Sequence, residues 1–349
     1  MNRRALGFTL GLALGILSGC ATVPDIASTA QAIANPVLDA NFPDPASIKA
    51  HDGYYYVYAT QGEVDGKMQN IQIVRSRDLQ IWERVGDALP DKPIWARQTQ
   101  DFWAPHVALH DGLYYLYYSA KPDIALADKV SGLCLAVATA TTPQGPFVDM
   151  GKPLQCGDGF INIDPMSFDD PGTGKRLLYW GSGFGPIKVR ELASDRMSFA
   201  PGSPTIDLVD VIKNDDPKNY QRLVEGAWVV LHDGYYYLFY SGDNCCGPNA
   251  PYAVMVARSR SATGPFEALA HATGAPNSVI LEANGRWIAP GHNAILKDAR
   301  GQYWTLYHAV DAKRSREKAT DDVNSRRVML LSPIEWVDGW PVIRPPLAE

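Results

Sequence analysis

The chain has 349 residues, of which 46% are hydrophobic and 10% aromatic, so a large core can form. Its formal net charge is −6 and it contains no basic run interleaved with aromatic residues, which argues against nucleic acid as a partner. The 17 Tyr and 9 Trp favour strands over helices, because aromatic side chains fit the pleated surface of a sheet.

Residues 1–20, "MNRRALGFTLGLALGILSGC", are typical of a signal peptide, with two Arg, an apolar stretch and small residues before Cys20. The apolar part is too short and too rich in Gly for a membrane span. "LSGC" resembles the lipobox of bacterial lipoproteins. This resemblance implies a lipid on Cys20 and export to the periplasm or cell surface, with anchoring to the outer membrane. An ordinary signal peptide cut further on is the alternative. Residues 21–35 then form a tether and residues 36–349 the folded domain.

A turn followed by a tyrosine-rich run occurs three times: "HDGYYYVYAT", "HDGLYYLYYSA" and "HDGYYYLFYSG". The turn Asp stands at 52, 111 and 233, which corresponds to one and then two steps of about 60 residues. Weaker copies fill the remaining steps, "DPGTGKRLLYWGSG" at 170–183 and "KDARGQYWTLYHAV" at 297–310. The sequence therefore predicts five units.

Each unit offers about four strands. A strand precedes the turn, the tyrosine-rich strand follows it, and then come a strand such as "AVMVARS" and an edge piece such as "GPFVDMG". Four-stranded antiparallel sheets repeated around an axis form a β-propeller, so we predict an all-β protein with five blades. The tyrosine-rich strands read as continuous apolar runs because neighbouring blades cover both of their faces. A β-sandwich with coincidental hairpins is the alternative, and the even spacing argues against it.

The first strand of each blade lines the axis of a propeller, so matched residues before the turns should meet there. Counting eight residues back from the turn Asp gives Asp44, Trp103 and Glu225 in three units. The aligned residue of the third unit is Asp164, and His292 lies close to the matched position of the fifth. We therefore expect three carboxylates to gather around the axis.

Carboxylates in such a crowded place repel one another and lose hydration, so chemistry explains them better than stability does. Glycoside hydrolysis needs one protonated acid and one ionised carboxylate around the bond to be cleaved. The longer Glu225 suits the proton donor, with a pKa raised by burial and by the negative charge of Asp164. Asp44 would stay ionised and activate water, and Trp103 offers an apolar face to a sugar ring.

These residues carry a resemblance to the family 43 glycoside hydrolases over essentially the whole mature chain. "NFPDP", "INIDP" and "LVEGAW" resemble the motifs of the base, the pKa modulator and the acid, and "DFWAPHV" and "RSRSATGPF" are further phrases of the family. The resemblance implies an inverting mechanism with Asp44 as base, Asp164 as modulator and Glu225 as acid. The "EGAW" segment departs from the many relatives that have Pro after the Gly.

The same resemblance implies roles for two further residues. His292 in "APGHNA" would face the axis and help to hold a Ca²⁺ ion, largely through water. Calcium prefers oxygen ligands, so a His that is hydrogen-bonded without metal is the alternative. Arg327 matches an axial Arg that orients Glu225 or a substrate hydroxyl, and a surface Arg is the alternative there. No organic cofactor is expected.

Two phrases bear on the substrate: "WGSGFGPIKV" and "CCGPNAPYAVMVARSRSATGPF" look closer to arabinanases and exo-acting arabinofuranosidases than to xylosidases. The chain also lacks the C-terminal β-sandwich of many xylosidases. We therefore expect cleavage of α-L-arabinofuranosidic bonds in plant cell-wall arabinan or arabino-oligosaccharides, with endo or exo action left open. A β-D-xylosidase of the same family, a retaining sucrose-splitting propeller and a non-catalytic glycan-binding propeller are the alternatives.

Four cysteines follow Cys20, and their spacing fits no zinc pattern. Cys134 and Cys156 flank a predicted hairpin and could form a disulfide in an oxidising compartment, with two free thiols as the alternative. Adjacent cysteines rarely bridge each other, so Cys245 and Cys246 stay unassigned.

Overall fold

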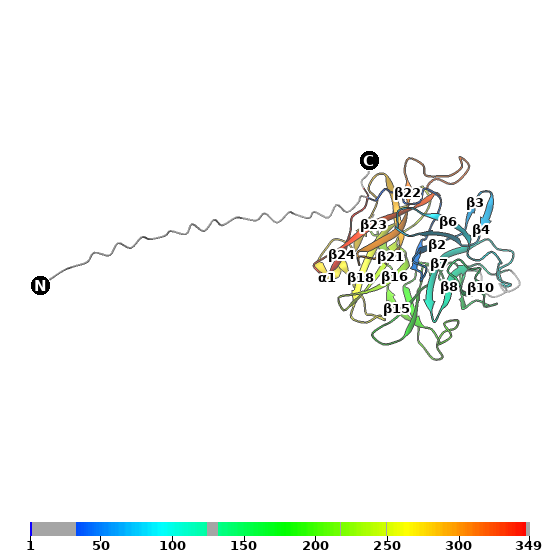
Figure 1. Cartoon of the computed structure of the whole chain (residues 1–349), viewed down its shortest axis with the longest axis horizontal. Coiled ribbons are helices and arrows are strands. Elements are labelled where there is room, and N and C mark those ends of the chain that lie inside the picture. Colours follow the sequence, from blue (N-terminus) through cyan, green and yellow to red (C-terminus); the bar gives the residue numbers. More distant parts are fainter. Residues whose placement is uncertain (2–32, 124–131, 217, 249, 347–349) are drawn as a thin grey trace. The chain divides into compact units, whose positions relative to one another are not determined.

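The computed structural model describes Met1 and residues 33–123, 132–216, 218–248 and 250–346. The expected signal peptide after Met1, its Cys20 and residues 21–32 of the expected tether lie outside this described part. From Ile33 onwards the described chain is almost entirely β-structure, and its five main sheets are the blades of a propeller (Figure 1), which confirms the predicted fold. No helix in the described part is long and apolar enough to cross a membrane.

Each blade contains four antiparallel strands in chain order. The strands of the first three blades are β1 (Ala46–Lys49), β2 (Tyr55–Ala59), β5 (Gln72–Ser76) and β6 (Glu83–Asp87); β7 (Phe102–His110), β8 (Leu113–Ala120), β9 (Cys134–Ala140) and β10 (Val148–Asp149); β12 (Met166–Asp169), β13 (Arg176–Trp180), β14 (Ile187–Glu191) and β15 (Ile206–Val209). Those of the last two are β16 (Val224–His232), β17 (Tyr235–Gly242), β18 (Ala253–Ser259) and β19 (Glu267–Ala268); β21 (Trp287–Lys297), β22 (Tyr303–Asp311), β23 (Arg327–Val337) and β24 (Trp340–Ile343).

Short elements decorate the blades. The strands β11 (Gln155–Cys156) and β20 (Val279–Leu281) add to the second and fourth sheets, and β3 (Gly62–Val64) pairs with β4 (Lys67–Gln69) in a separate hairpin. The short helices are η1 (Tyr220–Arg222) and α1 (Leu269–Thr273).

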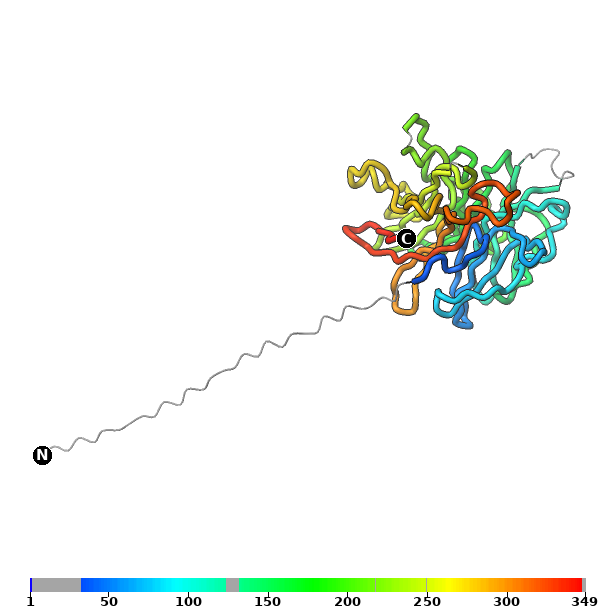
Figure 2. Tube along the Cα trace, turned by 90° about the horizontal axis from the view of Figure 1, so that it is seen from above, coloured from blue at the N-terminus to red at the C-terminus, as the bar shows by residue number. Residues whose placement is uncertain are grey.

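The first strands of the blades contact one another in a closed ring, β1 to β7 to β12 to β16 to β21 and back to β1. The start of the domain fastens this ring, because Leu38 pairs with Met329 of β23. Asn35, which the sequence placed in the tether, also exchanges two hydrogen bonds with Leu331 of that strand. Figure 2 shows the blue start of the domain beside the orange-red segment near its end. The two ends of the domain thus meet in the fifth blade.

Tyrosine recurs in the second strands because its ring fills the space between blades while its hydroxyl finds a partner in the next blade. A buried hydroxyl without a partner would destabilise the fold. The hydroxyls donate to carbonyl oxygens of the following blade at 2.5–2.9 Å, in the pairs Tyr58–Pro143, Tyr117–Arg196, Tyr179–Ala262 and Tyr237–Gly339. The repeated phrase therefore joins the blades both by apolar packing and by hydrogen bonds.

Both cysteine pairs are disulfides. Cys134 of β9 and Cys156 of β11 join two strands of the second blade, so the disulfide rather than the pair of free thiols is present. Cys245 and Cys246, which the sequence left unassigned, also bridge each other. Their loop follows β17, at the end of the domain where the predicted acids gather.

Candidate active site

One residue near the start of each first strand has a left-handed backbone. These residues are Asp44, Ala104, Asp164, Gly226 and His292, with φ between 46° and 62°. A β-bulge after Trp103 in β7 and another after Glu225 in β16 each add a residue to the strand. Ala104 and Gly226 lie seven residues before their turn Asp, whereas Asp44 lies eight before Asp52, so the count of eight ends one residue early in these two blades. Trp103 and Glu225 precede the matched position and do not occupy it.

Four of these left-handed residues are held by the blade before them. Their backbone N–H groups donate to a side chain near the end of the preceding second strand, in the pairs Ala104–Thr60 at 2.8 Å, Asp164–Ser119 at 3.2 Å, His292–Ser241 at 2.8 Å and Asp44–His308 at 3.1 Å. The remaining residue, Gly226, donates instead to Oδ2 of Asp164 at 2.9 Å. At that joint the hydroxyl of Ser182 is directed to Glu225. The repeated pattern is thus changed where the predicted acid lies.

A cavity of about 380 Å³ lies at the mouth of this ring, a volume within the usual range of ligand pockets. It is lined by all six residues that the sequence predicted for the site, Asp44, Trp103, Asp164, Glu225, His292 and Arg327. The three carboxylates are at most 9% exposed. Residues separated by up to 283 positions in the chain are therefore brought together as expected.

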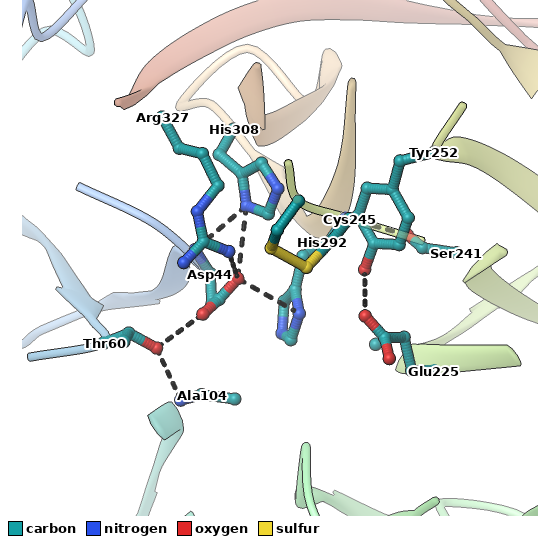
Figure 3. Close-up of polar contacts among 12 residues, drawn as sticks. Asp44, Thr60, Ala104, Glu225, Ser241, Cys245, Tyr252, His292, His308 and Arg327 are labelled. Carbon is teal, nitrogen blue, oxygen red and sulfur yellow. Dashed lines mark hydrogen bonds and ion pairs between the residues drawn. A yellow bond between two sulfur atoms is a disulfide. The ribbon is translucent and has the colours of Figure 1, made fainter. Parts of the chain in front are cut away.

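Asp44 is surrounded by the cation Arg327, two imidazoles and a hydroxyl group (Figure 3). Its Oδ1 accepts a hydrogen bond from Nη1 of Arg327 at 3.1 Å and lies 3.2 Å from Nδ1 of His308 and 3.6 Å from Nδ1 of His292. Its Oδ2 accepts from the hydroxyl of Thr60 at 2.5 Å. Burial alone would raise the pKa of Asp44, but Arg327 and the two imidazoles hold it well below its usual value. Asp44 is therefore ionised near neutral pH.

Glu225 meets neutral hydroxyls instead of cations. Its Oε1 accepts from the hydroxyl of Tyr252 at 2.9 Å, and its Oε2 accepts from that of Ser182 at 2.9 Å. No Lys, Arg or His in the described part of the chain forms an ion pair with it. Burial raises the pKa of Glu225 to about 7; the two hydroxyls oppose that shift, and the charge of Asp44 adds to it. Glu225 therefore stays largely protonated up to neutral pH.

Asp164 lies between the other two carboxylates. Its Oδ2 is 3.8 Å from Nδ1 of His292 and accepts from the N–H of Gly226, the residue after Glu225. Burial, and then the charges of Glu225 and Asp44, raise the pKa of Asp164 well above its usual value. Close carboxylates share protons in this way. Asp164 and Glu225 therefore titrate as a coupled pair, and the charge of Asp44 adds to the upward shift of both pKa values.

Arg327 lines the cavity with its side chain 17% exposed, and it is not a surface residue. Its partner is Asp44 at the base end of the cavity, and its guanidinium makes no contact with Glu225. The sequence analysis predicted that Arg327 orients either Glu225 or a substrate hydroxyl. The structure pairs it with Asp44 and not with Glu225. A permanent cation beside Asp44 instead favours the ionised form of that carboxylate.

Several site residues escaped the sequence analysis. Ser182 and Thr60 could have been found, because each tyrosine-rich run ends in a small residue that carries a hydrogen-bonding group or, in the fifth unit, in His308. Tyr252 and the Cys245–Cys246 pair come from a loop outside the repeat, where no matched position marks them. Side-chain partners of this kind follow only from the folded geometry.

The surroundings of His292 do not form a direct metal cage. No group of three or more His, Cys, Asp or Glu in the described residues is placed to hold an ion. The neighbouring Asn293 is 1% exposed and its side-chain polar atoms have no partner, which suits a water molecule there. The cavity beside it measures about 10 Å³, roughly the space of one water. An ion near His292 would therefore be held through water, and no catalytic step below uses it.

Comparison with known proteins agrees with this geometry. The family model "Glycosyl hydrolases family 43" matches residues 33–341. The "Probable arabinan endo-1,5-alpha-L-arabinosidase A" of Aspergillus fumigatus is 29% identical, covering 91% of this chain and 96% of that protein. The "Extracellular exo-alpha-(1->5)-L-arabinofuranosidase ArbA" of Cellvibrio japonicus is 26% identical over 86% of this chain and 85% of that protein.

A solved structure, "Structure of Cellvibrio cellulosa alpha-L-arabinanase complexed with Arabinohexaose", superposes with a TM-score of 0.71 at 22% identity. It covers 88% of this chain and 96% of that chain, and so shares the propeller fold. Since the family model spans nearly the whole described domain, the chain belongs to the glycosyl hydrolases of family 43.

Proposed function

We propose that the protein hydrolyses α-L-arabinofuranosidic bonds in arabinan or arabino-oligosaccharides with inversion of the anomeric carbon. The observation that carries this proposal is a single cavity in which Asp44 is ionised and Glu225 is protonated. Opposite pKa shifts of two carboxylates are what acid and base catalysis on one bond require. The names of the relatives, which include endo-acting and exo-acting arabinan hydrolases, support the choice of sugar.

In the proposed reaction, Asp44 accepts a proton from a water molecule as that water attacks the anomeric carbon. Glu225 gives its proton to the glycosidic oxygen, and the bond between that oxygen and the anomeric carbon breaks. The water enters from the side opposite to the leaving group, so an α-linked arabinose leaves as the β-anomer. Asp44 then loses its proton to solvent and Glu225 regains one, which restores the starting state.

The remaining residues serve this step in distinct ways. Tyr252 and Ser182 fix the orientation of the Glu225 carboxyl by binding one oxygen each. Arg327 keeps Asp44 ionised despite its burial. Trp103 lines the cavity and offers an apolar face to a sugar ring. Asp164 would modulate Glu225 through the proton that the pair shares.

Location and metal content belong to the same proposal. We propose export directed by residues 1–20, with a lipid on Cys20 and the outer membrane as the anchor; one relative is itself named extracellular. Mass spectrometry of the membrane fraction tests the lipid, since Cys20→Ser should release the protein into solution.

A Ca²⁺ ion held through water near His292 is tested by dialysis against EDTA, which should lower activity until calcium is returned.

The test of the activity compares hydrolysis of linear arabinan, an aryl arabinofuranoside and an aryl xyloside by wild type and Glu225→Ala. The proposal expects hydrolysis of one or both arabinose substrates by wild type alone. Faster hydrolysis of the xyloside would indicate a xylosidase. A wild type as inert as the variant on every substrate, yet able to bind a glycan, would indicate a binding protein. Product sizes from arabinan then separate endo from exo action.

A further inference from the structure

The Cys245–Cys246 disulfide lies in the wall of the same cavity as Asp44 and Glu225. Figure 3 draws the bridge among the polar residues of the site. Both cysteines are half-buried, so part of the bridge faces the cavity. Nothing in the proposed reaction uses this bridge, and its position next to the reacting groups calls for an explanation.

Stabilisation of the fold does not explain a bridge between neighbours. A disulfide stabilises a protein mainly by closing a loop of the unfolded chain, and the effect grows with the length of the loop. The Cys134–Cys156 bridge closes a sequence separation of 22, whereas Cys245–Cys246 closes a separation of 1. The second bridge therefore restricts almost no chain, and its use must be sought in the surface that it makes.

The loop that carries the bridge is held in place from both sides. Before the bridge, Asp243 forms an ion pair with Arg222 at 2.5 Å. After it, the side-chain amide of Asn324 donates to the carbonyl oxygen of Gly247 at 2.9 Å and of Pro248 at 3.2 Å. These contacts fix the wall before any substrate arrives, which lowers the entropy lost on binding.

The bridge itself packs on the acid end of the site. Cys245 contacts the small apolar cluster that contains Tyr252, whose hydroxyl binds Glu225. The backbone of Cys246 is already satisfied, because its carbonyl oxygen accepts from Asn244 at 2.7 Å and its N–H donates to the same side chain at 3.4 Å. Bridging also removes both S–H donors. What remains available to the cavity is sulfur and methylene surface that binds polar groups only weakly.

We propose that the Cys245–Cys246 disulfide is a sugar-binding surface, against which the C–H face of a furanose ring of the substrate packs beside Glu225. A furanose ring has an apolar face of C–H groups, and other apolar side chains such as Trp103 and Phe184 already line this cavity. Phe184 is 61% exposed, so the wall is open to an entering ligand. The inference rests on the proposed function, since it names a binding surface of that site.

The first test compares two double variants, Cys245→Ala/Cys246→Ala and, as the matched control, Cys134→Ala/Cys156→Ala. The substrate is a linear α-1,5-linked arabino-oligosaccharide. Loss of the contact with one ring face should raise KM about tenfold in the first variant with kcat within about twofold of wild type. The control should keep its KM and lose thermal stability. A KM unchanged in the first variant, or a loss confined to kcat as from a displaced Tyr252, would overturn the inference.

The second test does not depend on the folding of a variant in which the pair is replaced. In the Cys134→Ala/Cys156→Ala protein, the remaining bridge is reduced with a phosphine and its state is followed by mass. Reduction should raise KM about tenfold, and reoxidation should restore it. An unchanged KM after complete reduction refutes the inference.

Failure of the proposed function is recognised separately. A wild type that does not hydrolyse the oligosaccharide contradicts the function, and the same pair of variants is then compared by calorimetric binding of that sugar. Weaker binding by the Cys245→Ala/Cys246→Ala protein alone would still support a sugar-binding surface. Equal binding, or no binding by either protein, would reject it.

Discussion

The surroundings of Asp44 and of Glu225 differ although both carboxylates lie in the same cavity and are almost equally buried. Asp44 lies at the joint between the fifth and first blades, where Arg327, His308 and His292 face it. Glu225 lies at the joint between the third and fourth blades, where the neutral hydroxyls of Ser182 and Tyr252 bind it. Burial raises the pKa of both groups, and at Asp44 the cation Arg327 together with the two imidazoles reverses this effect.

This comparison shows how a symmetric ring acquires two different acids. Every blade offers a position at the end of its second strand that can bind the next blade. Serine or threonine there leaves the charge of the neighbour unchanged, whereas at the joint that carries His308 the permanent cation Arg327 also faces Asp44. The division between base and acid therefore depends on which joint carries Arg327.

The largest expected effect distinguishes the acid Glu225 from the base Asp44 by comparing substrates whose leaving groups differ in acidity. Glu225→Ala should lower kcat on arabino-oligosaccharides by about 10²–10⁴-fold, because the leaving oxygen then receives no proton. The loss should be much smaller on an aryl arabinofuranoside with an acidic phenol, which leaves without that proton. Asp44→Ala should be impaired on both substrates, since attack by water is always needed. Equal losses of both variants on both substrates would contradict the assignment.

A smaller effect is expected when the cation beside the base is removed. In Arg327→Gln, no permanent cation offsets the effect of burial on Asp44, so the pKa of Asp44 should rise. The acidic limb of the pH profile should therefore move to higher pH. We expect kcat/KM near pH 5 to fall about tenfold or more, as when one partner of a buried ion pair is removed. Arg300→Gln, which removes an exposed pair with Asp298, serves as control. An unshifted acidic limb would show that Arg327 does not set the charge of Asp44.

The proposed acid Glu225 should control the alkaline limb of the pH profile. Because Glu225 must be protonated and its pKa is about 7, kcat/KM should decline as pH rises through that value. Tyr252→Phe removes a hydrogen bond that lowers this pKa, so the alkaline limb should move to higher pH. The activity of each protein is expressed relative to its own maximum. On that scale, Tyr252→Phe should lose roughly two- to fivefold less activity than wild type between about pH 7 and 9. Tyr240→Phe, a buried tyrosine bonded to Gln221, is the control. A shift to lower pH would contradict the account.

The smallest effect concerns stability. Glu225 binds its proton more tightly when folded, with a pKa of about 7 against an ordinary 4.5, so unfolding gains from its ionisation as pH rises between these values. Glu225→Gln removes this penalty and should raise Tm by about 2–4 °C near pH 8, with the gain disappearing below about pH 4.5. The exposed Glu63→Gln is the control for thermal scans at both pH values. A variant that is destabilised near pH 8 would argue that folding does not raise the pKa of Glu225.

The fold could be predicted because each blade repeats the same pattern of turn, tyrosine-rich strand and small residue. The repeat also located the site, since equivalent strands must meet at the axis. It placed Trp103 and Glu225 one residue before the matched position, because the number of residues between that position and the turn differs from blade to blade.

What escaped prediction depends on contacts between distant side chains. The pairing of Arg327 with Asp44 crosses the joint that closes the ring, and no local pattern indicates which carboxylate it faces. Tyr252 and the Cys245–Cys246 bridge come from a loop that the repeat does not govern. Adjacency left these cysteines unassigned, and only the folded loop shows that they bridge each other.

The most direct test is the anomeric form of the first product, followed by ¹H NMR during early hydrolysis of an α-linked arabino-oligosaccharide. With water activated by Asp44 on one side and the leaving oxygen protonated by Glu225 on the other, the first product formed should be the β-anomer, which then equilibrates in solution. Release of the α-anomer would contradict the division of labour between these two carboxylates.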